Sequence, residues 1–468
     1  MHLQTTEQRY REFLDTLPLS TLRILGRQFG VASASSSHKS GLIDEIVAIL
    51  TEKVVPGPRT KRGAPAKVTY VDPAILERLN EIKKKGLTPG RIVMEVAQSD
   101  ERDTTFEDPV HTGLLELTAG GYGFVRAVGA PAAGREEVYV PAPAVHSLAL
   151  REGDRVVCTV RRGAKSGVVS LSELLSVNGL PQGSYEGRPL FEELTAVSSV
   201  EKIGLSEGGD VSLRLVDLFV PVGKGQRVLV SGEAGTGKTA LLRALAREVG
   251  AFRRDVELVC LLVGGRPEEK SELSAAIGRG IVISSPFEES AEHHAAAAGL
   301  ALAHAKRLAE QGKHVVLLID SLTELAYAYD AQEEKGRLRP GLSAAALGRV
   351  KRWFGAGRNT KEAGSLTVIA SILTGTGNEA DTVLYEALKG AVNAEIVLSR
   401  DLARRRIFPA VDLSRSGNRT EEAFLSEEEV RALSLLRAKG TETDAVLRLL
   451  RETQANGAFV RRVTDGAL

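Results

Sequence analysis

The sequence lacks any apolar run long enough to cross a membrane. Of its 468 residues, 43% are hydrophobic and 26% are charged, which is typical of a water-soluble globular protein. No apolar run approaches the roughly 18 residues that a membrane-spanning helix needs. The opening stretch MHLQTTEQRYREF is polar and lacks the apolar core of a signal peptide. We therefore expect a cytoplasmic protein with no membrane partner.

Cysteine is also scarce. Cys158 and Cys260 lie far apart, each inside an apolar stretch that predicts a strand. This excludes a disulfide-rich scaffold and offers no zinc motif, so both are expected to be buried, reduced thiols. The net charge of +1 sums 61 basic and 60 acidic residues, so overall charge neither favours nor excludes a nucleic-acid partner.

The length of the chain predicts several domains, because it exceeds what one hydrophobic core usually holds. Changes in the local sequence pattern indicate where these domains lie. Residues 1–50 carry apolar residues at helical spacing and predict a small helical unit. Residues 51–108 are mixed, with a proline-rich basic stretch, and are expected to be a linker or insertion. Short alternating runs in residues 109–178 predict a small β-barrel. Strands alternating with helices in residues 179–468 predict a parallel sheet covered on both faces.

The strongest local signal is GEAGTGKT, residues 232–239, which fits the P-loop pattern G-x-x-x-x-G-K-[ST] between a predicted strand and an amphipathic helix. Its glycines let backbone amides approach phosphate oxygens at a helix N-terminus. Lys238 can reach the β- and γ-phosphates, and the Thr239 hydroxyl can ligate Mg²⁺. The sequence therefore predicts a site for ATP and Mg²⁺.

A carboxylate follows another apolar strand in the stretch HVVLLID, which ends in Asp320. The carboxyl ends of parallel strands form the edge where such sheets bind ligands. Asp320 would there hold Mg²⁺ through water beside Thr239. An aspartate in this place is otherwise a common helix N-cap, and that alternative stays open.

Two aromatic residues in GGYGFVR, residues 120–126, suggest a nucleic-acid surface. Tyr122 and Phe124 lie two apart, so on a strand both rings face the same side. Such rings can stack on unpaired bases, with Arg126 on phosphate or a base, or they can fill the barrel core. Basic residues on a later turn favour a single-strand groove, although a solvated cluster is an alternative: Arg161, Arg162 and Lys165.

Together these motifs resemble the Rho family of bacterial transcription termination factors. The resemblance runs from about residue 16 to residue 462, apart from residues 51–108. It is carried by LSTLRILGRQFGV, GGYGFVR, EEVYV, LFEELTAV, VGKGQR, the P-loop, RPEE, LLIDSLTELAYAY, KRWFGAGRN, GSLTVIA, YEALKG and RRIFPAVDLSRSGNRTEE.

The resemblance implies a fold and an activity. The fold is an α/β RecA-like P-loop ATPase domain with a mainly parallel sheet, preceded by a small helical unit and an OB-fold, cold-shock-like barrel. Six such chains would form a homohexameric ring. The activity would be that of an RNA-dependent ATPase and helicase that captures nascent single-stranded RNA and releases the transcript, with RNA polymerase and elongation factors as partners.

The resemblance also assigns roles to residues. Phe408 would pack on adenine, and Arg415 and Arg419 would reach the ATP of the neighbouring subunit, acting in catalysis with Lys238, Thr239 and Asp320. Nucleotide contacts are implied for Gly223, Lys224, Gly225, Gln226, Arg227, Val228, Gly235, Thr236, Gly237, Lys238, Thr239, Ala240 and Arg266. RNA contacts are implied for Gly121, Tyr122, Gly123, Phe124, Val125, Arg126, Glu137, Val138 and Tyr139.

One departure from the family falls where hydrolysis needs a carboxylate. The family has Asp-Glu before RPEE, and its Glu is taken to polarise the attacking water; here Gly264 and Gly265 stand in those places. A general-base contribution of roughly 10² to 10⁴ in rate would then be missing. Rescue by Glu268 or Glu269, a few residues later, is left open.

Other departures concern the expected pore. The family's Gly-rich loop is replaced by AQEEKGRLRPGLS, and by alignment Asn378 or Glu379 replaces an RNA-holding lysine. Glu324 stands where the family has arginine. The loop's own basic residues lie in altered places: Lys335, Arg337 and Arg339.

These departures keep a second hypothesis open beside the RNA-dependent translocase. It is a degenerate Rho-like ring that binds RNA and ATP as a regulator, with weak or no hydrolysis. A RecA-like ATPase of the rotary or recombination type would share the fold but leaves the barrel and RSGNRTEE unexplained.

Overall fold

The computed structural model describes residues 6–19, 21–23, 25, 31, 38–50, 110–126, 137–163, 168–333 and 341–466. The chain divides into two compact units, Met1–Arg102 and Asp103–Leu468. In the first unit, helices α1 (Thr6–Asp15) and α3 (Lys39–Leu50) contribute to an apolar core of their own. The expected linker, residues 51–108, lies outside the described residues, so its predicted boundaries remain predictions.

The second unit opens with a small β-barrel. Its six strands run in the order β3-β2-β1-β4-β5-β6, and a further pairing between β3 and β5 brings the edges together. Alternate residues point inward, so that Val125, Val138 and Val140 join one core cluster, as period-2 spacing predicts. The elements are β1 (Val110–Leu117), β2 (Gly123–Arg126), β3 (Val138–Val140), α5 (Ala142–Ser147), β4 (Arg155–Arg162), β5 (Val169–Val177) and β6 (Leu180–Pro181).

A nine-stranded sheet forms the centre of the unit, in the order β12-β11-β13-β15-β10-β16-β17, with β14 beside β15 and β7 beside β14. From β12 to β16 all neighbouring strands pair in parallel, so their carboxyl ends share one edge. This confirms the predicted mainly parallel sheet. Its strands are β7 (Ala196–Val197), β10 (Arg227–Gly232), β11 (Val256–Gly265), β12 (Ile281–Pro286), β13 (His314–Asp320), β14 (Arg358–Thr360), β15 (Ser365–Leu373), β16 (Ala394–Leu398) and β17 (Gly417–Asn418).

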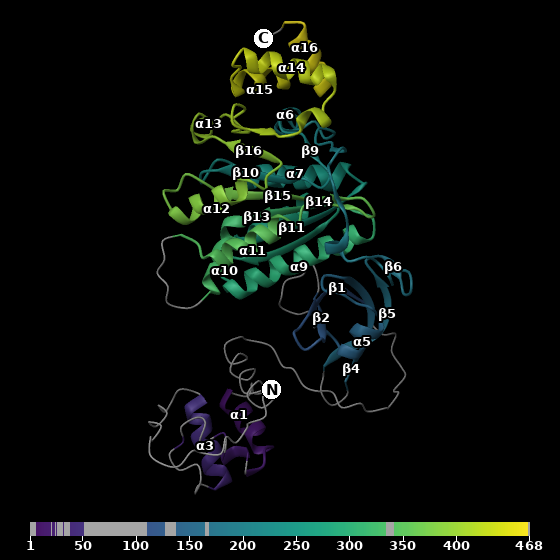
Figure 1. Ribbon diagram of the computed structural model, residues 1–468, viewed down its shortest axis with the longest axis vertical. Helices are drawn as coiled ribbons and strands as arrows, with labels where there is room; N and C mark the ends of the chain where they lie inside the picture. Colours follow the sequence, from purple (N-terminus) through teal and green to yellow (C-terminus); the bar gives the residue numbers. More distant parts are fainter. Residues whose placement is uncertain are drawn as a thin grey trace. The chain divides into compact units, whose positions relative to one another are not determined.

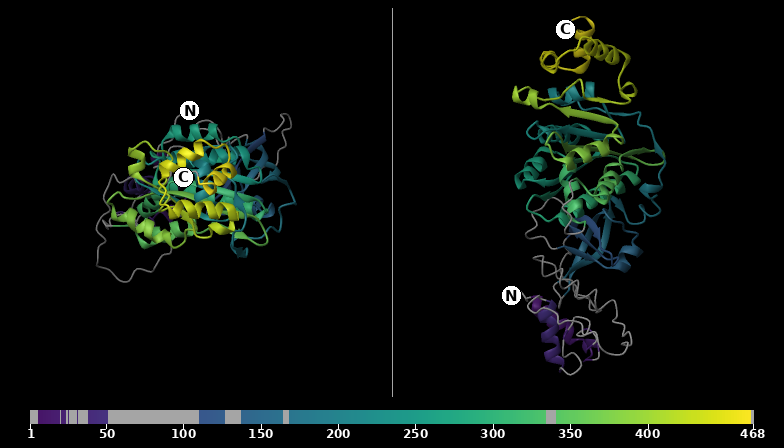
Figure 2. Two further views of the ribbon diagram at one scale, coloured as in Figure 1. Left: turned by 90° about the horizontal axis from the view of Figure 1, so that it is seen from above. Right: turned by 60° about the vertical axis from the view of Figure 1, so that its left-hand side comes forward.

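Helices cover both faces of this sheet, as Figures 1 and 2 show. Strand residues alternate between two buried clusters, so that Leu258 and Cys260 join one while Val259 and Leu261 join the other. The first cluster is completed by α6 (Val211–Phe219), α7 (Lys238–Phe252), α8 (Pro267–Ala276), α14 (Glu427–Ala438), α15 (Thr443–Arg451) and α16 (Asn456–Thr464). The second contains α9 (Ala291–Glu310), α10 (Leu322–Ala331), α11 (Ala344–Phe354) and α12 (Glu379–Lys389).

Smaller elements complete the unit: η1 (Phe191–Glu193), β8 (Lys202–Ile203), β9 (Val222–Gly223), α13 (Arg400–Arg404) and η2 (Glu421–Ala423). Cys158 and Cys260 are both free and buried, as expected. Burial raises the pKa of Cys158 to about 11 and that of Cys260 to about 12, which keeps both thiols protonated at neutral pH. Within the described residues, no helix combines the length and the apolar character needed to cross a membrane.

A buried ionic network joins the barrel to helix α9. Asp154 of the barrel, fully buried, accepts hydrogen bonds of 2.8 and 2.6 Å from the Arg188 guanidinium. Glu310, at the end of α9, pairs with Arg151 of the barrel at 3.2 Å and with Arg307 at 2.7 Å. Removing one partner of such a network leaves an unpaired buried charge, which is strongly destabilising. The network therefore fixes the barrel against the ATPase layer.

The barrel and α9 also approach closely at Gly153, in the turn before β4. A Cβ atom at this position would lie 2.3 Å from the backbone nitrogen of His304 and 2.5 Å from the carbonyl carbon of Ala303. The buried His304 ring is hydrogen bonded through Nδ1 to the Gly153 carbonyl at 2.8 Å. Burial lowers the pKa of His304 to about 4, so the ring is neutral and its Nδ1–H donates this bond.

Gly153→Ala should separate the barrel from α9. Because Gly153 has φ of 82°, alanine costs about 1–2 kcal/mol in backbone strain, and the clash with α9 adds to it. Gly179→Ala is the matched control, since Gly179 has φ of 87° with nothing within 4 Å of its Cβ position. Thermal unfolding of the purified variants should show a larger drop in midpoint for Gly153→Ala. Equal drops would contradict the packing described here.

Candidate nucleotide and RNA sites

The P-loop connects β10 to α7 at the carboxyl edge of the sheet. Gly235 and Gly237 have φ of 75° and 96°, a left-handed conformation that glycine adopts at little cost. Gly237 is the N-cap of α7 and offers no side chain, so the first amide groups of the helix stay open to an anion. Lys238 Nζ donates to the carbonyls of Gly232 and Glu233, at 2.7 and 2.8 Å, and burial lowers its pKa. The ammonium thus lies across the phosphate-binding turn.

A hydroxyl and a carboxylate meet beside the P-loop. Thr239 Oγ1 donates to Asp320 Oδ2 at 2.7 Å, and Ser371 of β15 donates to the other oxygen of Asp320. The N-cap of α10 is Ser321, whose hydroxyl accepts from the Glu324 amide. Asp320 is therefore not the helix cap, and the structure brings it to Thr239 as the nucleotide-site hypothesis predicts.

Two further predicted nucleotide contacts lie at the same edge. The Phe408 ring, 42% exposed, lies 3.9 Å from the position that a Cβ on Gly237 would take. Arg266 is the exposed N-cap residue of α8, directly after β11. Phe408 thus comes to the P-loop from a distant part of the sequence. Its contact with adenine remains a prediction.

Residues 223–228 lie at the other end of β10. The P-loop follows the carboxyl end of that strand, while residues 223–226 precede its amino end, roughly 20 Å away at the usual rise per residue. Here Lys224 pairs with Asp255 at 3.0 Å, and the Gln226 side chain accepts from Asn418 at 2.9 Å. The structure does not bring this segment to the P-loop of its own chain, and its nucleotide contact stays a prediction.

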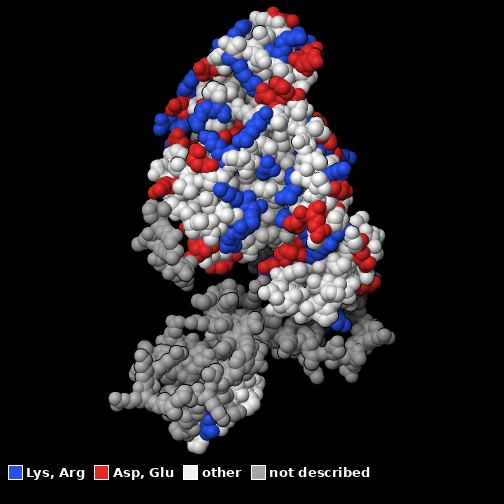
Figure 3. Space-filling view, in the orientation of Figure 1, with Lys and Arg blue, Asp and Glu red and all other residues white. Residues whose placement is uncertain are grey.

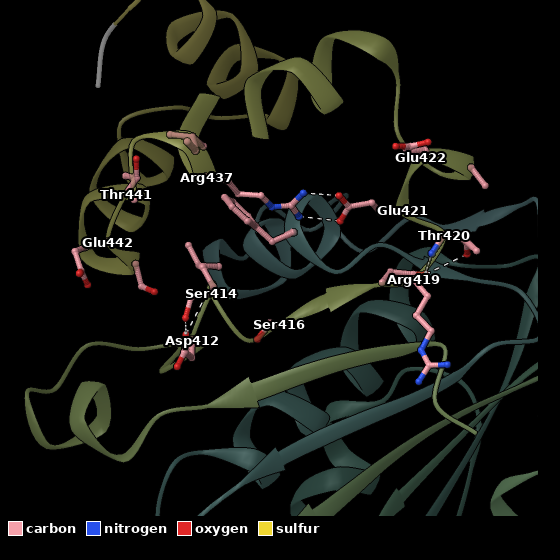
Figure 4. A pocket seen from close by; sticks show the side chains of 17 residues that line it. Asp412, Ser414, Ser416, Arg419, Thr420, Glu421, Glu422, Arg437, Thr441 and Glu442 are labelled. Atoms are coloured by element: carbon pink, nitrogen blue, oxygen red, sulfur yellow. Dashed lines mark hydrogen bonds and ion pairs between the residues drawn. The ribbon is translucent and has the colours of Figure 1, made fainter. Parts of the chain in front are cut away.

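The two arginines predicted to act on a neighbouring subunit are both exposed. Arg415 and Arg419 lie on the segment between β16 and η2. Arg419 donates to the Lys389 carbonyl at 2.8 Å and lines an open cavity of about 970 Å³. Figure 4 shows its side chain directed away from the pair formed by Arg437 and Glu421. Both guanidinium groups are thus accessible to another molecule.

The two glycines at the end of β11 face carboxylates from other elements. A Cβ on Gly264 would lie 2.8 Å from Cγ of Glu324, and one on Gly265 would lie 2.9 Å from Oε2 of Glu269. Glu269 also accepts the Arg266 amide hydrogen at 3.1 Å and so caps α8. In the sequence, Glu324 is notable only because the family has arginine in its place. The signal for its position at this edge was that it follows Asp320 by four residues, while the neighbouring strand ends without a carboxylate.

The barrel aromatics lie outside the barrel core. Tyr122, Phe124 and Tyr139 are half-buried on the strand face opposite Val125 and Val138, which belong to the core cluster. The three ring centroids lie 5.7 to 5.9 Å from one another. The structure therefore favours an aromatic surface over the alternative in which these rings fill the core, and it adds Tyr139 to the pair.

Glycine and arginine complete this aromatic surface. A Cβ on Gly123 would lie 2.8 Å from the Glu116 carbonyl oxygen, so only glycine fits there. Arg126 forms ion pairs with Glu116 and with Glu137, the latter at 3.1 Å. Two carboxylates therefore already balance the charge of Arg126, which was predicted to meet phosphate or a base.

Comparison with known proteins covers both sites. Residues 111–182 match the model for the Rho termination factor, RNA-binding domain, and residues 212–417 match the ATP synthase alpha/beta family, nucleotide-binding domain. Transcription termination factor Rho of Streptosporangium roseum is 42% identical over 338 residues, 70% of this chain and 86% of that protein. That of Allochromatium vinosum is 39% identical over 342 residues, 71% of this chain and 81% of that protein. The chain belongs to the Rho family.

Among solved structures, an ATPase from the type III secretion system of pathogenic bacteria aligns with TM-score 0.49 and 21% identity, over 63% of this chain and 94% of that chain. The matches to the Rho RNA-binding domain and the nucleotide-binding domain confirm the predicted fold class. The same relatives confirm the resemblance inferred from the motifs.

The loops expected to line a Rho-family pore are described only in part. Lys335, Arg337 and Arg339 lie outside the described residues, as does Lys165 of the barrel. Asn378 caps α12 by accepting the Ala380 amide hydrogen at 3.0 Å and donates to the Tyr327 hydroxyl at 3.1 Å. Glu379 follows it and is exposed, so the described part of this loop presents an acid.

Charge is distributed evenly on the visible face of this Rho-family chain. Figure 3 shows Lys and Arg interspersed with Asp and Glu over the ATPase layer. Strand β4 of the barrel carries exposed arginines at both ends: Arg155 at its start, and Arg161 and Arg162 at its end. Because a net charge of +1 does not exclude local segregation of basic residues, it neither favours nor excludes RNA as a partner.

Tyr122→Ala combined with Phe124→Ala should weaken RNA binding by about 1–3 kcal/mol per stacked base. The rings lie outside the core, so the thermal midpoint should change little. Phe252→Ala, which removes a 46% exposed ring from the end of α7, is the control. The measurement is the dissociation constant for a pyrimidine-rich oligonucleotide. An unchanged constant in the double variant would rule out the stacking role.

Proposed function

We propose that this Rho-family chain is an RNA-dependent ATPase and translocase that binds nascent single-stranded RNA and facilitates transcription termination. The observation that carries the proposal is the combination, within one compact unit, of a complete P-loop with the Thr239–Asp320 pair and a barrel with three clustered aromatic rings. RNA polymerase and elongation factors would be its partners in the cytoplasm.

The nucleotide site fits ATP with Mg²⁺. The Thr239 hydroxyl and the Asp320 carboxylate, 2.7 Å apart, are the hard oxygen donors that Mg²⁺ takes beside nucleotide phosphates. Thr239 and Asp320 would hold Mg²⁺, which would supply positive charge to neutralise the nucleotide phosphates. Lys238 and the open amides of α7 would bind the same phosphates, while Phe408 would pack on the base.

A ring of identical chains would complete each site. Arg415 and Arg419 are exposed, which is consistent with an arginine supplied in trans. A planar guanidinium can stabilise charge that develops on the γ-phosphoryl group and link hydrolysis to assembly. We therefore include a homohexamer in the proposal.

A second candidate function is a regulatory ring that binds RNA and ATP without efficient hydrolysis. It is favoured by Gly264 and Gly265, which cannot orient water through a side chain, and by the acidic residue at the tip of the α12 loop. The two candidates differ in one measurable property, the turnover of ATP in the presence of RNA.

Phosphate release from ATP should rise when pyrimidine-rich RNA is added to the natural protein. Lys238→Ala should abolish release, because its ammonium lies across the phosphate-binding turn. Gly265→Glu supplies the carboxylate expected from the family, in a position whose nearest neighbour is the movable end of Glu269. No stimulated turnover in the natural protein, with a gain in Gly265→Glu, would support the regulatory ring instead.

Arg419→Ala subunits should inhibit natural subunits when the two are mixed. If each arginine acts on the neighbouring site, the rate should fall more steeply than the fraction of natural subunits. Arg431→Ala, which removes an exposed arginine from α14, is the matched control and should dilute the rate in proportion. A proportional fall with Arg419→Ala would contradict action in trans.

A further inference from the structure

Three carboxylates lie near the strand ends beside the P-loop, and two of them are engaged. Asp320 accepts hydrogen bonds from Thr239 and Ser371, and Glu269 accepts one from the amide that begins α8. Within the described residues, no donor is hydrogen bonded to the carboxylate of Glu324, and this side chain is exposed. Of these three carboxylates, Glu324 is therefore the one that is open to a water molecule.

Glu324 occupies the place that a side chain at the end of β11 would take. Strand β11 pairs with β13 so that Leu262 lies opposite Asp320, and Gly264 follows two residues later. A Cβ on Gly264 would lie 2.8 Å from Cγ and 3.2 Å from Cδ of Glu324. The carboxyl group of Glu324 thus stands beside Gly264, where the family has Asp, one residue before the place of the family's water-polarising Glu.

The backbone conformation at position 264 favours glycine, which leaves room for the Glu324 side chain. Gly264 has φ of 68°, and the pairing of β11 with β12 shifts register between Val263 and Gly265, which is the pattern of a β-bulge. Any other residue at 264 would meet both backbone strain and the Glu324 side chain. Glycine at 264 and an acid at 324 are therefore sterically compatible, whereas a side chain at 264 would displace Glu324.

We propose that Glu324 is a catalytic residue that accepts a proton from the water attacking the γ-phosphorus of ATP. In this step the water oxygen bonds to the γ-phosphorus, and the bond from that phosphorus to the bridging oxygen of ADP breaks. One water proton passes to the Glu324 carboxylate and then to solvent, leaving ADP and inorganic phosphate. The inference rests on the proposed ATPase function and needs no reactant besides water.

The surroundings of Glu324 suit this role. Partial burial raises its pKa, and the nearby negative charge of Asp381 raises it further, which makes the carboxylate a better proton acceptor. Asp381 is itself buried and fixed by hydrogen bonds from Tyr327 at 2.5 Å and Thr376 at 2.6 Å. The charge near Glu324 is thus held in place by a donor from α10 and a donor from the loop before α12.

The test compares Glu324→Gln with Glu269→Gln and with Glu428→Gln, a control that removes an exposed first-turn carboxylate from α14. Three quantities are measured on the full chain: single-turnover phosphate release with RNA, affinity for ATP, and the fraction of bound nucleotide recovered as ATP after quenching. We expect Glu324→Gln to slow release by roughly 10² to 10⁴-fold, to bind ATP at least as tightly, and to retain it as ATP.

Each other result has a distinct meaning. Turnover in the natural protein that persists in Glu324→Gln overturns the inference and leaves the ATPase function standing. Loss in Glu269→Gln alone assigns the role to Glu269 and also overturns it. Loss of ATP affinity in Glu324→Gln would show a binding role rather than proton transfer. If the natural protein binds ATP and RNA without turnover, the ATPase function fails, and the role of Glu324 fails with it.

Discussion

The parallel pairing of β11, β13, β15 and β10 is the constraint on which the nucleotide site depends. Because these strands run in one direction, the P-loop, Asp320 and Gly264 emerge at one edge. Strand β15 separates β10 from β13 and contributes Ser371, whose hydroxyl holds one oxygen of Asp320 while Thr239 holds the other. The sheet thus fixes the carboxylate before any ligand arrives.

The RNA-binding barrel is attached to this sheet by charge and by close packing. Asp154 and Glu310 are buried acids linked through arginines, and Gly153 allows the turn before β4 to contact α9 directly. Alanine side chains of α9, among them Ala298 and Ala301, pack in the same core as β11 and β13. Contiguous packing therefore connects the barrel to the strands that end in Gly264 and Asp320.

At the end of β11, a glycine stands beside a carboxylate that comes from another element, α10. Glycine at 264 leaves room for the longer Glu324 side chain from the first turn of α10, and Asp381 supplies a fixed negative charge nearby. The Glu324 side chain thus fills the space that a side chain at position 264 would occupy. In this arrangement the missing carboxylate at β11 is not by itself a sign of an inactive ATPase.

The sequence by itself determined the P-loop, the α/β pattern with helices on both faces of the sheet, the barrel and the pairing of Tyr122 with Phe124, because each follows from contiguous residues or a short period. Only the tertiary structure decided that residues 223–228 lie at the far end of β10, that Tyr139 joins the aromatic surface, and that Glu324 stands against Gly264. These relations depend on which strands pair and in which register, and no local pattern specifies contacts between segments so far apart in the chain.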